Sequence, residues 1–337
     1  MTELSMMDID KLEKDIGDSQ ETTLNLRRKV FQCEKSRKSS SDVLSSDKQV
    51  NFFTKLKSIV LFRALLQWLT TGWKPAVKTK LSSESQLLIV FMKLRLGLLN
   101  QDLAYRFGVG SATVSRIFRE WVEKMSVSLS SCIAWPSHGP KVMPQCFRHK
   151  FFQNVVCVID CSDIFIDTPR NLDARSQTYS NYKHHNTVKF LIACSPDGGI
   201  IFLSKLYGGR HSDKEITIDS GFLNLVKSGD KILADRGFRI EEVVGLKGAR
   251  IVVPAFTTGK SQLSGREVSH SRIISKARVH IERCIRRIKS YRILKSTWPP
   301  TYLTEMSAGK SLGYHILTTL GGLCNIAKPS LINFELA

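Results

Sequence analysis

Apolar residues recur at helical spacing through the first part of the chain. Helices are predicted over KSIVLFRALLQWL (57–69), SSESQLLIVFMKLRLGL (82–98), QDLAYRF (101–107) and SATVSRIFREWVEKM (111–125). Only Gly108-Val109-Gly110 separates the last two segments. Two helices joined by a short glycine-containing turn, with the second one longer, are typical of a helix-turn-helix. The pattern predicts a small all-α helix-turn-helix domain over residues 51–130.

The last of these segments divides into an apolar and a polar face. Val114, Ile117, Phe118 and Trp121 have the spacing of a core-facing stripe. The open side carries Ser111, Thr113, Arg116 and Arg119. We expect these four to contact DNA, because arginine reads guanine edges and hydroxyls bind phosphates. The alternative is a three-helix bundle with a solvated polar face.

The second half of the chain contains strand-like segments. They are VVCVIDCSDIFID (155–167), TVKFLIACSPDGGIIFLSKLY (187–207) and DKILADRGF (230–238). The SPDGG turn makes the middle segment a hairpin. Residues 270–295 then carry apolar positions at helical spacing. Strands followed by strand–helix alternation predict an α/β domain over residues 150–327.

The first fifty residues are polar and include the serine-rich stretch SRKSSSDVLSS. Such a composition offers little to bury, so we expect a mostly disordered segment. Two basic clusters within it, RRK at 27–29 and KSRK at 35–38, suggest a split nuclear-import signal, although a solvated charge run explains them equally well. The nucleus is the expected location. Every long apolar run is interrupted by Lys or Arg, so no membrane span is predicted.

Charge narrows the class of partner. The chain of 337 residues carries 50 Lys and Arg against 30 Asp and Glu, a net charge of +20. Residues 1–50 have a net charge of −1, residues 51–150 of +11 and residues 151–337 of +10. The excess therefore belongs to the two predicted domains, and it favours a polyanionic partner, with DNA first. The 8 cysteines are scattered without a CxxC pair, which argues against structural zinc and a disulfide framework and for a reducing intracellular compartment.

Three acids stand out against this basic background. Asp160 lies in the first strand-like segment and Asp235 follows another. Glu282 is the single acid among nine Lys and Arg in residues 270–295. Mg²⁺ prefers carboxylate oxygens, and two such ions support phosphodiester cleavage. By itself, Glu282 also fits a plain salt-bridge partner of Arg278 or Arg286 on the same helix.

Several ordered motifs resemble those of a known family. These are VVCVIDCSDIFI, the stretch YSNYKHHNTVKFLIACSPDGGIIFLSKLYGGRHSDKEI, DKILADRGF and RVHIERCIRRIKSYRIL. In order and separation they resemble the DDE superfamily endonuclease domain of Harbinger-type and insertion-sequence-like transposases, over roughly residues 150–327. The helical block ahead of them resembles the module that precedes this domain. In animals the domain often follows a THAP zinc finger, for which residues 1–50 lack the Cys/His spacing.

The resemblance implies a fold and a chemistry. The implied fold is α/β and RNase H-like, of the integrase type: a mixed sheet with flanking helices. Asp160, Asp235 and Glu282 match the three catalytic acids, which would bind two Mg²⁺ or Mn²⁺ ions. The implied ions generate hydroxide for strand cleavage and then activate a DNA 3′-OH for joining.

Neighbouring residues are further candidates. We expect Arg236, Arg278 and Arg286, which flank the acids, to hold DNA. Asp213 matches a recurring Ser-Asp of the family; it either caps the following helix, which we favour, or assists the metal site. Lys183 is an accessory candidate for a phosphate contact, although a polar turn explains it too.

Three functions compete. The first is a metal-dependent DNA endonuclease and strand transferase, a transposase or its derivative. The second is a domesticated, non-catalytic DNA-binding protein that keeps the fold. The third, an RNase H-like nuclease acting on another nucleic acid, is disfavoured by the helix-turn-helix pattern. Either a homo-oligomer or a separate DNA-binding partner protein is compatible with the sequence.

Overall fold

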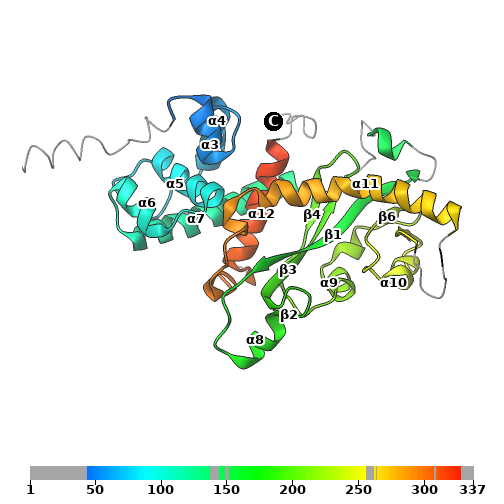
Figure 1. The fold of residues 1–337 in the computed structure, drawn as a ribbon. Coiled ribbons are helices and arrows are strands. Elements are labelled where there is room, and N and C mark those ends of the chain that lie inside the picture. Colours follow the sequence, from blue (N-terminus) through cyan, green and yellow to red (C-terminus); the bar gives the residue numbers. More distant parts are fainter. Residues whose placement is uncertain are drawn as a thin grey trace, which may run out of the picture.

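The computed structural model of the chain describes residues 44–136, 144–148, 152–255, 262, 264–306 and 309–327. Residues 1–43, with both basic clusters, lie outside these ranges. The described part has a helical region on one side and a sheet with flanking helices on the other, as Figure 1 shows. No described helix is both long and apolar enough to cross a membrane.

The helical region contains five α-helices. They are α3 (Asp47–Thr54), α4 (Ile59–Thr70), α5 (Ser83–Leu96), α6 (Asn100–Phe107) and α7 (Ser111–Leu129). Serine side chains cap the first turns of α4 and α5, and Gly97 and Gly108 end α5 and α6 in the left-handed conformation. Leu44 and Val50 are buried, so the helical region begins before residue 51.

The sheet is mixed. Its strands are β1 (Val155–Phe165), β2 (Tyr179–Ser180), β3 (His185–Cys194), β4 (Ile200–Leu203), β5 (Tyr207–Gly208), β6 (Lys231–Leu233) and β7 (Arg250–Val252). The order is β2-β3-β1-β6-β7, with β4 and β5 also paired to β3. The pairs of β3 with β1, β2, β4 and β5 are antiparallel, whereas β6 runs parallel to both β1 and β7. This confirms the expected mixed sheet and the predicted hairpin at SPDGG.

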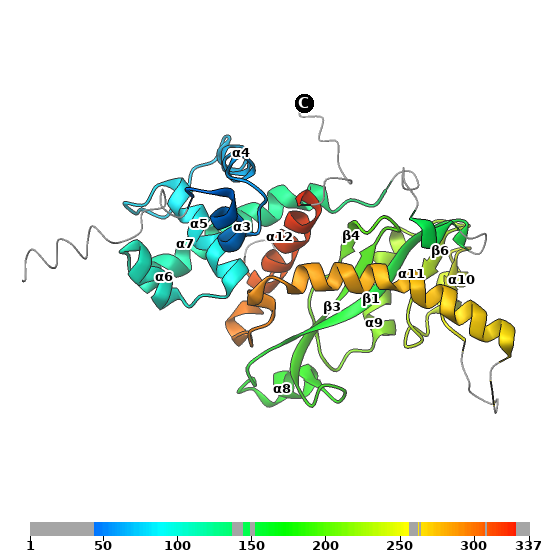
Figure 2. The same cartoon turned by 45° about the horizontal axis from the view of Figure 1, so that its top comes forward.

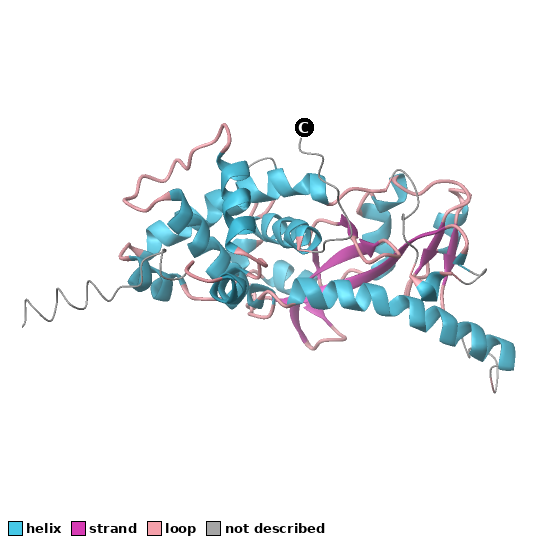
Figure 3. Ribbon diagram, turned by 90° about the horizontal axis from the view of Figure 1, so that it is seen from above, coloured by secondary structure: helices cyan, strands magenta, loops and turns pink. Residues whose placement is uncertain are grey.

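Helices cover both faces of the sheet. One face packs against α11 (Gly265–Lys289), whose Ala277, Ile281 and Ile288 share a core with Val158 and Ile164 of β1. The other face packs against α9 (Asp213–Asp219) and α10 (Glu241–Gly245), with Cys157 and Ile159 of β1 in that second core. Successive residues of β1 therefore face opposite layers, as a strand requires. Figure 2 shows α11 crossing over the strands, and Figure 3 shows this long helix running beyond them at one end.

The last helix connects the two regions. α12 (Leu312–Ile326) packs against α7 and β4, and the core on the α11 side includes residues from the helical region as well. A Cβ atom at Gly322 would lie 2.6 Å from Leu129 Cβ, so only glycine permits this close approach of α12 to α7. His315 of α12 also forms a hydrogen bond with Ser126 of α7, with Nδ1 and Oγ 2.9 Å apart. The helix-turn-helix and the sheet are thus parts of one continuous core.

Candidate active site

The strand register brings Asp160 and Asp235 together. Val158 of β1 pairs with Leu233 of β6 in parallel, and each aspartate follows two residues later. β6 ends at Leu233, so Asp235 lies in the loop opposite Asp160. Each carboxylate accepts a hydrogen bond from the next backbone N–H, at 2.8 Å from Cys161 N and at 2.8 Å from Arg236 N. These hydrogen bonds orient the two carboxylates, and the register of β1 and β6 places the two residues side by side.

The pKa of Asp160 is shifted upward. Burial raises its pKa to about 6, because desolvation disfavours the carboxylate. The Arg278 guanidinium and the Cys161 N–H act in the opposite direction, whereas the charges of Asp235 and Asp213 raise the pKa further. A half-buried carboxylate that lies in the field of other negative charges favours a cation nearby.

Glu282 reaches the same place from α11. It is exposed and lines a cavity of about 390 Å³ together with Asp160. The rest of the lining is Cys161, Ser162, Asp163, Phe165, Lys183, Ile285, Arg286 and Lys289. Lys289 donates from Nζ to the carbonyl oxygen of Asp163 at 2.8 Å. The lining thus combines the acidic residues Asp160, Asp163 and Glu282 with the cations Lys183, Arg286 and Lys289.

Arg278 pairs with one of the three acids. Its Nη1 lies 3.2 Å from Asp235 Oδ1, with 13% of the Arg278 side chain exposed against 51% for Asp235. One turn later on α11 comes Glu282. The Arg278 Nε is buried and lacks a hydrogen-bond partner among the described residues. Arg278 therefore offsets negative charge beside Asp235, and its expected contact with DNA stays a prediction.

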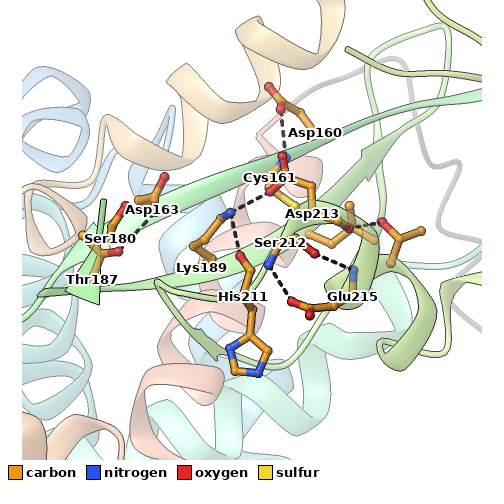
Figure 4. Close-up of polar contacts among 12 residues, drawn as sticks. Asp160, Cys161, Asp163, Ser180, Thr187, Lys189, His211, Ser212, Asp213 and Glu215 are labelled. Atoms are coloured by element: carbon orange, nitrogen blue, oxygen red, sulfur yellow. Dashed lines mark hydrogen bonds and ion pairs between the residues drawn. The ribbon is translucent and has the colours of Figure 1, made fainter. Parts of the chain in front are cut away.

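Asp213 belongs to a network on the opposite side of β1, drawn in Figure 4. Its Oδ1 lies 2.7 Å from Lys189 Nζ, which also donates to the carbonyl oxygen of His211 at 3.1 Å. Burial and the adjacent Asp213 raise the pKa of the Cys161 thiol. The helix cap is Ser212, which forms a capping box with Glu215. The expectation that Asp213 caps α9 is therefore wrong: Asp213 is the first residue inside the helix, and its carboxylate pairs with Lys189 of β3.

Comparison with protein families identifies both regions. Residues 159–325 match the family described as DDE superfamily endonuclease, and residues 79–131 match the helix-turn-helix of DDE superfamily endonuclease. The chain belongs to the DDE superfamily endonucleases. No curated protein matches the chain.

All three candidate acids of this DDE superfamily endonuclease lie within the matched residues 159–325. The structure pairs Asp160 with Asp235 by register and with Glu282 across a cavity. In the part of the chain that is described, no three His, Cys, Asp or Glu side chains form a group that could hold a metal ion. The donor chemistry nevertheless fits Mg²⁺ or Mn²⁺, because the acids offer hard oxygens, and burial together with the charges of Asp235 and Asp213 raises the pKa of Asp160. Their role as metal ligands stays a prediction.

The helix-turn-helix of this DDE superfamily endonuclease presents the expected face. Arg116 and Arg119 of α7 are exposed, whereas Ser111 and Thr113 are half-buried near its start. The opposite face buries Val114, Ile117, Phe118 and Trp121. The segregation of faces is confirmed, and contact of the four polar residues with DNA stays a prediction.

The other candidate cations have different surroundings. Arg236 is exposed beside Asp235, Arg286 is exposed at the cavity, and Lys183 lines the cavity with its Nζ 4.6 Å from the Tyr182 ring centroid. Sequence reasoning did not select Lys289 as a site residue, although it follows Glu282 by seven residues, two turns along the same helix face. It also missed Lys189, whose partner Asp213 is distant in sequence. No local pattern reveals such a pair.

Proposed function

We propose that this DDE superfamily endonuclease is a transposase-type enzyme that cuts DNA phosphodiester bonds and joins the released ends. The single observation that carries the proposal is the placement of Asp160 beside Asp235 by strand register, with Glu282 across one cavity ringed by cations. DNA is the substrate because the chain is strongly basic and contains a helix-turn-helix of this family.

Each group has a distinct task in this proposal. Asp160, Asp235 and Glu282 would hold two divalent ions, Mg²⁺ or Mn²⁺. When bound, such ions polarise the phosphodiester and supply a nucleophile at neutral pH. Arg286 and Lys183 at the cavity bind phosphate oxygens of the strand.

Lys289 has a positioning task. Its ammonium binds the Asp163 carbonyl, so it ties α11, and with it Glu282, to β1. Burial lowers the pKa of Lys289, while the charge of Asp163 raises it. Arg278 keeps Asp160 and Asp235 from repelling each other when no other cation is present.

Nicking of supercoiled plasmid in Mg²⁺ or Mn²⁺ tests the proposal. The wild type is compared with Asp160→Asn, Asp235→Asn and Glu282→Gln, each of which removes one charged oxygen donor with little change in shape. Glu241→Gln is the matched control, because Glu241 is exposed on α10 outside the cavity lining. We expect the three site variants to lose nicking and the control to keep it.

Two outcomes decide against catalysis. Equal residual nicking by wild type and all site variants would defeat the assignment of the three acids. DNA binding with no nicking by the wild type would favour the domesticated, non-catalytic alternative.

Location and assembly complete the proposal. A nuclear location follows from DNA as substrate together with the basic clusters at residues 27–38. Assembly as a homo-oligomer, or with a separate DNA-binding protein, would supply recognition of a second DNA end. Fluorescent-fusion imaging with and without residues 1–43 tests the first point, and light scattering with and without DNA tests the second.

A further inference from the structure

At the end of the sheet away from α10 lie α8 (Leu172–Thr178) and β2 (Figure 1), and residues of both elements line a second cavity. Its volume is about 420 Å³, within the range of small-ligand sites. Its lining consists of Leu172, Arg175, Ser176, Tyr179, Asn181 and Arg210. This lining has two guanidinium groups and no carboxylate, so it suits an anion.

Close backbone packing places Arg210 at this cavity. A Cβ atom at Gly209 would lie 2.7 Å from the Thr178 carbonyl oxygen, so glycine lets this segment approach the end of α8. The Arg210 N–H then donates to the carbonyl oxygen of Gln177 at 3.2 Å, and its Nη1 donates to Ser176 Oγ at 3.2 Å. Arg210 is thereby attached to α8 at both backbone and side chain.

Hydrogen bonds also hold α8, which supplies part of the lining, to the sheet. The buried Asn186 of β3 donates from Nδ2 to the Arg175 carbonyl oxygen at 2.9 Å and to Thr178 Oγ1 at 2.8 Å. α8 is therefore fixed on the sheet while the Arg175 and Arg210 side chains remain exposed. Within the described ranges, neither guanidinium has an ion pair with a carboxylate. Both charges are available to an external anion.

One turn connects this cavity with the candidate active site. Asn181 lines the second cavity, and Lys183, two residues later, lines the cavity that holds Asp160 and Glu282. Tyr179, 41% exposed, adds an aromatic ring to the lining of the second cavity. A DNA strand that follows this turn would have its phosphates near Lys183 at one cavity and near Arg175 and Arg210 at the other.

We infer that the second cavity binds the phosphodiester backbone of the DNA strand that runs through the candidate active site. Arg175 and Arg210 bind its phosphate oxygens, and Tyr179 packs against the adjoining sugar or base. The inference rests on the proposed function for the identity of the strand. It adds a contact region on the catalytic domain that is separate from the helix-turn-helix.

Salt-dependent DNA binding tests the inference. Affinity for a fluorescent duplex is measured without divalent metal, so that cleavage plays no part. Arg175→Gln/Arg210→Gln is compared with the matched control Lys227→Gln/Lys247→Gln, which removes the same charge from exposed positions near α10. Loss of two phosphate contacts lowers the slope of log affinity against log salt by roughly 1.8. We expect this change in the arginine variant and not in the control.

Photocrosslinking provides a second measurement in an otherwise intact chain. p-Benzoylphenylalanine in place of Tyr179 should crosslink to DNA, whereas the same group in place of the exposed Leu246 should not. Equal salt slopes for both double variants, with no crosslink from position 179, would overturn the inference. Plasmid nicking by the wild type would then still support the proposed function. Conversely, a crosslink and a reduced slope without any nicking would uphold the inference and defeat catalysis.

Discussion

Asp160 and Asp235 are neighbours because each follows, by two residues, one member of the parallel pair Val158 and Leu233. This proximity is set by the backbone register of β1 and β6, so a change of side-chain rotamer does not move the two backbone positions apart. It also brings like charges together, and the Arg278 guanidinium at 3.2 Å from Asp235 offsets this repulsion. The site therefore contains its own counter-ion.

Removing that counter-ion should make stability depend on divalent metal. In Arg278→Gln, the crowded carboxylates lose their internal cation, so we expect a lower melting temperature in chelator than for the wild type. Added Mg²⁺ should raise the melting temperature more in the variant, because the bound ion replaces the lost charge. Differential scanning fluorimetry checks both shifts. Equal metal-induced shifts in the two proteins would show that Arg278 does not compensate these acids.

Alanine at Gly209 should destabilise the fold. Its Cβ atom would meet the carbonyl oxygens of Thr178 at 2.7 Å and Thr187 at 3.0 Å, and such overpacking costs roughly 1–3 kcal/mol. Gly245→Ala is the control, because a Cβ atom there meets nothing within 4 Å. Urea unfolding of both variants measures the difference. Equal midpoints would mean that the segment after β5 relaxes without cost.

Lys93→Met should stabilise the helical region. Burial lowers the pKa of Lys93 to about 8, so charging this side chain in the folded state carries a penalty at neutral pH. Relieving it should add about 1–3 kcal/mol to the free energy of unfolding. Above about pH 8 the folded wild type loses this proton before the unfolded chain does, so the advantage should shrink as the pH rises toward 10.5. An advantage independent of pH would place its cause in packing alone.

His315 should make the contact of α12 with α7 sensitive to acid. Burial lowers its pKa, Glu123 raises it and Lys310 lowers it, with a net downward shift from 6.5. The unfolded chain then binds the proton more readily, so stability should be lost as the pH falls through and below 6.5. Urea midpoints at several pH values should fall less steeply for His315→Gln than for the wild type. Parallel pH profiles would contradict this role.

The exposed arginines of α7 should contribute to DNA affinity. Arg116→Gln/Arg119→Gln removes two cations from the open face of the helix-turn-helix, and each lost phosphate contact lowers the salt slope by about 0.9. Lys48→Gln/Lys57→Gln removes equal charge from exposed positions near α3 and serves as control. Fluorescence anisotropy at several salt concentrations separates the two. The prediction fails if both double variants behave alike.

Local patterns revealed much of this molecule. Periodicity predicted the helices around Gly108 and the hairpin at SPDGG, because burial of one face leaves a regular spacing of apolar residues. Asp160, within β1, and Asp235, just after β6, were recognisable from the apolar runs before them, and Glu282 from its cationic surroundings. The two family matches confirm that the chain belongs to a family with this fold.

Contacts between distant segments were beyond such reasoning. Periodicity tells which face of a helix is buried but not what covers it, so the packing of α12 on both α7 and β4 was not predicted. The same holds for Asp213, which was expected to cap α9 but lies in its first turn and pairs with Lys189 of β3. The ion pair of Arg278 with Asp235, which joins α11 to the loop after β6, was not predicted either.

The position of α12 has a consequence for where this enzyme would cut DNA relative to the sequence that it binds. Because α12 packs on α7 and on β4, and Gly322 permits its close approach to Leu129, the helix-turn-helix is fixed relative to the three acids. Such rigid packing keeps the distance between α7 and the three acids constant. We expect the chain to cut at a constant number of base pairs from the sequence that α7 recognises.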